Sequence, residues 1–183
     1  MKNEQGSSVK ISSRENLFSD SRNLSVSIAQ FIALLSVAIF APAINIQAVT
    51  GTLVNATLFV SASLLGIPAA ILIGVIPSVV SSVTGLLPAA ILPMVPFIIF
   101  SNAILILIFS ALEKKSYWRG VVAASFLKFA FLSVISYFVI GYFVPERVAS
   151  NIEVMMSYPQ LMTALSGGVL ASVVLGLMHK SER

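Results

Sequence analysis

Cysteine is absent from this chain of 183 residues, and charged residues are scarce and unevenly placed. Without cysteine there is neither a disulfide nor a thiolate metal site. Between Arg22 and Glu113 there is no Asp, Glu, Lys or Arg. A bilayer-spanning helix needs about 20 mostly apolar residues, so this block has room for about four helices. Only 10% of the chain is charged, against about 25% in a soluble domain. The composition therefore predicts a multi-pass protein of the cell membrane.

Motifs for several kinds of chemistry are also missing. No glycine-rich loop ends in GKS or GKT, which excludes ATP hydrolysis by a P-loop. No Asp or Glu lies within the apolar segments, where proton- and sodium-coupled carriers usually have carboxylates. The single histidine, His179, follows the last apolar segment, where an interfacial role is commoner than a catalytic one. We expect no enzyme, no metal and no cofactor. The net charge of +4 does not indicate nucleic-acid binding, because the basic residues flank membrane segments.

Six apolar segments predict an all-α bundle of six transmembrane helices. We expect them at residues 25–44, 52–65, 68–84, 97–112, 121–143 and 161–178. Glycine and proline interrupt the pattern at GIP, residues 66–68, and again in the proline-rich break at 85–96. A polar turn at 113–120 and a loop at 144–160 complete the connections. The second and third segments are short for a full span, which favours tilting or a re-entrant arrangement.

Charges outside the apolar segments indicate the orientation. With six helices, the tail 1–24, the turn 113–120 and the end 179–183 share one side, which has nine Lys and Arg residues. The opposite side has only Arg147. Because Lys and Arg concentrate in cytosolic loops, we expect both termini in the cytosol. Residues 1–24 are polar and serine-rich, which predicts a disordered tail before the membrane domain at 25–178.

Polar side chains from different segments fall at the predicted outer end. They are Asn45, Gln47, Asn55, Thr84 and Asn102. Their shared depth predicts a substrate pocket that opens outward. The alternative is that these groups only hydrogen-bond between helices. The break at 85–96 favours the pocket, since non-helical backbone at membrane depth is tolerated where it lines a cavity, although an ordinary extramembrane turn would also suit its prolines.

One lysine lies deep within an apolar stretch, SFLKFAFLS at 125–133. Lys128 is about 13 Å beyond the basic turn, in the inner half of the fifth helix. Ser125, Leu132 and Ser136 share its face, which we expect to point inward. A charge at such depth costs on the order of 3 kcal/mol. Three interpretations remain open: the ammonium extends to the cytosolic headgroups, binds free backbone carbonyls, or meets an anionic ligand group.

Small residues recur every fourth position on the first segment. Ser25, Ala29 and Ala33 form this stripe, which would let another helix approach closely. Gly168, Ser172 and Gly176 form a similar stripe on the last segment. Either stripe is also compatible with internal packing alone.

The run from GIPAAILIGVIPSVV through LLPAAILPMVPFIIFSNAILILIFSAL resembles the substrate-binding S components of energy-coupling factor (ECF) vitamin transporters. LPMVPFIIFSN, the basic turn and FLKFAFL are most similar to an S-component group of unassigned substrate. The resemblance covers about residues 25–178. It implies capture of a vitamin, a vitamin precursor or a metal ion from outside. It also implies docking, through Ala29 and Ala33, onto a membrane T component coupled to two cytosolic ATPases. The metal branch has a histidine in its N-terminal segment, and this tail has none.

Two other functions stay open from the sequence. A membrane scaffold or assembly factor would need no ligand, and its polar groups would pair among themselves. A small autonomous carrier would transport without an ATPase, although the missing carboxylates disfavour it.

Overall fold

The computed structural model describes residues 24–87, 89–144 and 146–181, which form helices without any strand. The tail at 1–23 and the last two residues lie outside this part. A first helix at 24–40 continues into η1 (Ala41–Ile44), a 3-10 helix. The other elements are α2 (Gln47–Leu65), α3 (Ile67–Val83), the 3-10 helix η2 (Ala89–Met94), α4 (Val95–Leu112), α5 (Tyr117–Phe143), α6 (Glu146–Met156) and α7 (Tyr158–Ser181).

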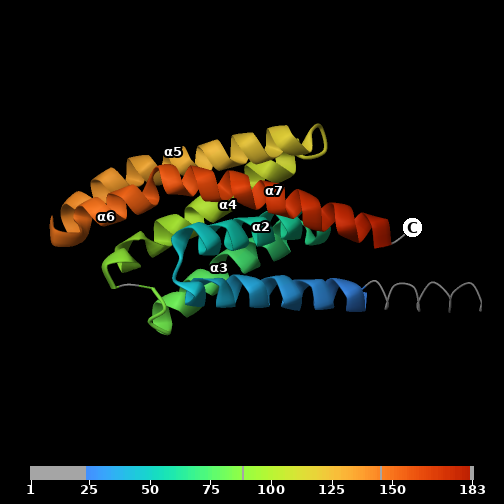
Figure 1. Cartoon of the computed structure of the whole chain (residues 1–183), viewed down its shortest axis with the longest axis horizontal. Coiled ribbons are helices and arrows are strands. Elements are labelled where there is room, and N and C mark those ends of the chain that lie inside the picture. Colours follow the sequence, from blue (N-terminus) through green and yellow to red (C-terminus); the bar gives the residue numbers. More distant parts are fainter. Residues whose placement is uncertain (1–23, 88, 145, 182–183) are drawn as a thin grey trace, which may run out of the picture.

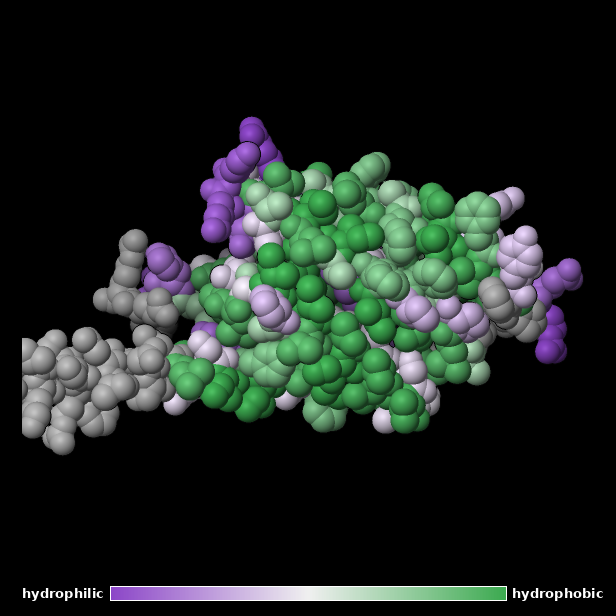
Figure 2. All heavy atoms as spheres, turned by 180° about the vertical axis from the view of Figure 1, so that it is seen from behind, coloured by the Kyte–Doolittle hydropathy of each residue, from purple (hydrophilic) through white to green (hydrophobic). Residues whose placement is uncertain are grey.

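Five of these helices are long and apolar enough to cross a membrane, and α3 is a shorter apolar helix. Figure 2 shows hydrophobic side chains over the middle of the visible face and hydrophilic ones towards its two ends. The prediction of an all-helical, polytopic membrane protein agrees with this arrangement. The first helix, α2, α3, α4, α5 and α7 run in alternating directions, and the beginning of the first helix lies at the same end of the bundle as the end of α7 (Figure 1).

Several predicted boundaries are wrong. The second helix begins at Gln47 rather than at residue 52, so it has 19 residues and is long enough to span. The predicted loop at 144–160 contains α6 and the start of α7. The break at GIP is confirmed: Gly66 has a φ of 82°, a conformation that favours glycine, and Pro68 stands in the first turn of α3.

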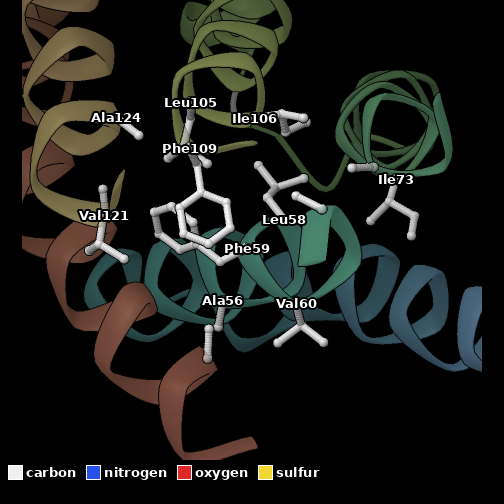
Figure 3. Close-up of a cluster of buried hydrophobic side chains, with 14 of the residues drawn as sticks. Ala56, Leu58, Phe59, Val60, Ile73, Leu105, Ile106, Phe109, Val121 and Ala124 are labelled. Atoms are coloured by element: carbon white, nitrogen blue, oxygen red, sulfur yellow. The ribbon is translucent and has the colours of Figure 1, made fainter. Parts of the chain in front are cut away.

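Two clusters of buried apolar side chains form the core. The larger centres on Phe59 of α2 and Phe109 of α4, whose ring centroids are 4.8 Å apart (Figure 3). The smaller joins η2, α5 and α6 through residues such as Met94, Leu132 and Ile152. The smaller cluster therefore fastens α6 to the end of the bundle that lies away from residue 24.

Glycines bring α7 very close to α2 and α5. A Cβ atom on Gly167 would lie 2.7 Å from the Cβ of Asn55 and 2.9 Å from the backbone nitrogen of Ala56. A Cβ on Gly168 would collide with Val121, so this member of the predicted stripe serves internal packing. Gly176, by contrast, is exposed with no atom near its Cβ position.

Replacing Gly167 with alanine tests this close approach. Because the obstructing atoms are the α2 backbone and the Cβ of Asn55, which cannot move aside independently of the helix, we expect Gly167→Ala to lower the free energy of unfolding by about 1–3 kcal/mol. Gly176→Ala is the matched control on the same helix, and it should be neutral or slightly stabilising. Thermal unfolding in detergent measures both variants. Equal melting temperatures for the two variants would contradict this close packing of α7 against α2.

Candidate functional site

A cavity of about 270 Å³ lies inside the bundle, and every helix contributes to its wall. Most of the lining surface is apolar, as in small-molecule sites generally, although ten of the 23 lining residues have polar side chains. Its volume is slightly below the range of about 300–1,000 Å³ that is usual for such sites. The wall includes the beginning of α2, the α3–α4 connection and the α6–α7 junction. These segments lie at the end of the bundle away from the beginning of the first helix and the end of α7 (Figure 1).

Lys128 is at the deep end of this cavity, with 3% of its surface exposed. Its Nζ donates hydrogen bonds of 2.7 Å to Oδ1 of Asn55 and of 2.7 Å to Oδ1 of Asn102. The Nδ2 of Asn102 donates to the backbone carbonyl of Gly74 at 3.2 Å. That last bond fixes the orientation of the Asn102 amide, because its oxygen must then face the ammonium. We call Lys128, Asn55 and Asn102 the lysine–amide cluster.

The cluster joins three helices near their middles. Lys128 is 11 residues beyond Tyr117, or about 16 Å along α5. The prediction that its face points inward is confirmed, since Ser125, Leu132 and Ser136 are all buried. In the structure the ammonium binds side-chain amides, and within the described residues it donates to no backbone carbonyl. None of the three interpretations that the sequence left open for Lys128 includes this pairing with Asn55 and Asn102.

The other predicted pocket residues divide into two groups. Asn45 and Gln47 line the cavity near its shallow end, whereas Thr84 is exposed and outside the lining. The hydroxyl of Thr84 donates to the carbonyl of Val80 in its own helix at 2.8 Å. A threonine can satisfy its hydroxyl within a helix in this way, so its depth in the sequence does not place it in a pocket.

Gln47 and Gln160 share one hydrogen-bond acceptor at the shallow end. Nε2 of Gln47 donates to the backbone carbonyl of Met155 at 2.8 Å, and Nε2 of Gln160 donates to the same carbonyl at 3.1 Å. This carbonyl is in the last turn of α6, where helices leave such groups without internal partners. Gln160 and Met155 line the cavity too, but sequence reasoning missed them because it placed both in a loop.

No carboxylate lines the cavity among the described residues. Glu113 accepts a hydrogen bond of 2.7 Å from the hydroxyl of Ser63, at the opposite end of the bundle. Glu146 and Glu153 are exposed on α6. The described residues also contain no group of three or more His, Cys, Asp or Glu side chains that could hold a metal ion. The positive charge of Lys128 therefore has only neutral amide partners.

The predicted partner-binding residues lie on the surface of the bundle. Ala29 and Ala33 are exposed on the first helix, as is Ser25 in the same stripe. Large apolar side chains of this helix, including Ile32 and Phe40, are exposed as well. The stripe thus does not serve packing within the described bundle.

Comparison with protein-family models, with curated proteins and with solved structures found no match to this chain.

Removing one acceptor should destabilise the lysine–amide cluster. We expect Asn102→Leu to lower the free energy of unfolding by about 1.5–3 kcal/mol, because a hydrogen bond to a charged group is lost. Lys128→Met should lower the free energy of unfolding by less in the Asn102→Leu variant than in the wild type. In the variant, this second substitution also removes a buried charge that has already lost one of its partners. A double-mutant cycle from unfolding in detergent measures the coupling. Additive effects of the two substitutions would contradict the interaction.

Proposed function

We propose that this chain is the substrate-capture subunit of an ECF-type importer, a six-helix S component with both termini in the cytosol. The observation that carries the proposal is the cavity. Every helix contributes to its wall, and the lysine–amide cluster is at its deep end. The cavity lies in the half of the bundle away from the beginning of the first helix and the end of α7. With cytosolic termini, that half faces outside. The subunit binds a vitamin-like small molecule there.

The exposed stripe on the first helix supports the second part of this proposal, the partner. Ala29 and Ala33 leave a shallow strip on the helix surface, where the backbone of another membrane helix fits closely. The partner is a membrane T component that couples two cytosolic ATPases to release of the substrate inward. The resemblance in residues 25–178 motivates this choice of partner.

A membrane scaffold is the second candidate, and one observation favours it. Asn55 and Asn102 do pair with a group of the same chain, as a ligand-free bundle requires. A scaffold has no use, however, for an internal cavity of about 270 Å³ with further polar groups along its wall. Association with the T component and retention of a small molecule distinguish the two functions.

Enlarging the stripe tests the partner. We expect Ala33→Trp to reduce the T component recovered with tagged protein from native membranes by roughly tenfold or more, because overpacking a close helix contact costs about 1–3 kcal/mol. Val134→Trp is the control, since Val134, like Ala33, is an apolar residue on the surface of the bundle, but it belongs to α5. Mass spectrometry identifies the T component and the two ATPases.

Two results would refute this part of the proposal. One is wild-type protein that recovers no T component. The other is an Ala33→Trp variant that recovers as much T component as Val134→Trp does.

A further inference from the structure

Protonated Lys128 has a positive charge that no carboxylate in the described part of the protein neutralises. The oxygens that accept from Lys128 belong to neutral amides. The three carboxylates in the described residues, Glu113, Glu146 and Glu153, lie elsewhere or are exposed. Amide oxygens provide hydrogen bonds but no net negative charge. An apolar cavity with one buried cation favours an anionic guest electrostatically.

Several hydrogen-bonding groups left over in the cavity can donate. An ammonium has three N–H groups, and Lys128 uses two of them on the amide oxygens. The Nδ2 of Asn55 donates to no group within the described residues, and Asn55 lines the cavity. The hydroxyl of Ser81, another lining residue with 1% of its surface exposed, also has no partner in the described part of the chain. A guest with acceptor oxygens matches these donors.

The remaining lining limits the size and charge of the guest. Lys128 is the only Lys or Arg among the lining residues that the structure describes. A phosphate group carries more than one negative charge at neutral pH, whereas a carboxylate carries one. Apolar side chains such as Val54, Ile91, Ile98 and Met156 form the wall around the polar groups. One cation and an apolar wall fit a monocarboxylate with a largely apolar body.

We infer that the cavity binds a small monocarboxylic acid, whose carboxylate accepts hydrogen bonds from Lys128 Nζ and Asn55 Nδ2. This assignment rests on the proposed capture function and specifies its substrate class. The carboxylate supplies the counter-charge that the bundle lacks at its centre. The apolar body of the acid lies against the wall towards the shallow end, beneath the Gln47 and Gln160 amides.

Supplying the counter-charge from the protein itself tests the inference. Asn55→Asp keeps the size of the side chain and an oxygen for Lys128, but it adds a negative charge and removes the amide donors. The variant should fold, with a melting temperature at or above that of the wild type. Its affinity for monocarboxylates should fall roughly 30-fold or more, as when one partner of a buried charge pair is lost. Asn151→Asp, the same change on the exposed side of α6, should leave the affinity unchanged.

The probe is an equimolar panel of small monocarboxylic acids, their primary amides and the corresponding primary amines. Full-length protein in lipid nanodiscs is incubated with the panel, and native mass spectrometry detects the retained members. We expect the wild type and Asn151→Asp to retain acids only, and Asn55→Asp and Lys128→Met to retain none. If Lys128→Met folds, its retention of acids is a second test of the inference. If Lys128→Met does not fold, Asn55→Asp alone decides the test.

Three outcomes overturn the assignment. They are preferential retention of amides or amines, undiminished retention of acids by Asn55→Asp, and no retention of any panel member. Retention of amides or amines would refute the monocarboxylate and leave a capture function in place. The capture function itself is tested separately by the recovered T component, so the two failures are distinguishable.

Discussion

The hydrogen bonds from Lys128 to Asn55 and Asn102 are the constraint around which the bundle is arranged. An ammonium at the centre of a bilayer costs about 3 kcal/mol by insertion scales. Each hydrogen bond to a charged group returns about 1.5–3 kcal/mol. Two such bonds are therefore of the same size as the insertion cost, and the cluster can persist without a guest. The cluster keeps a positive charge inside the bundle, and its hydrogen bonds offset most of the free-energy cost of burying that charge. Three helices must meet at one depth for this balance to hold.

Helices that meet this closely need small residues where they touch. Gly167 lets the α7 backbone approach α2 beside Asn55. Gly74, on α3, offers its carbonyl to the Asn102 amide, and a Cβ there would lie 3.4 Å from the Cβ of Asn102. Both asparagines are thus flanked by a neighbouring helix with no side chain in the way. The close approach at Gly167 restricts the position of Asn55, because tightly packed interiors allow little movement, whereas a Cβ at Gly74 would make only ordinary contact with Asn102.

The sequence was sufficient for the membrane class, the break at Gly66 and the inward face of Lys128, since these depend on long hydrophobic runs and on helical spacing. It was insufficient for pairings between helices. Asn55, Asn102 and Lys128 come from three segments, and nothing local specifies which amide meets the ammonium. The α6 helix was missed because its charged side chains suggested a loop. Ile152 and Met156, four residues apart and both buried, were the available signal of its apolar face.

The two ends of the cavity differ in how firmly they are held. The deep end combines a buried charge with glycine-mediated packing. At the shallow end, α6 is joined to α2 and α7 by two neutral hydrogen bonds to the Met155 carbonyl, each worth about 0.5–1.5 kcal/mol. Water can replace those bonds at an interface, because it also donates to carbonyls. Breaking the lysine–amide cluster would instead expose an ammonium to an apolar interior. Because the smaller apolar cluster fastens α6 to η2 and α5, the least costly separation is between α6 and α2, which places access to the cavity at that end and keeps the charged end closed.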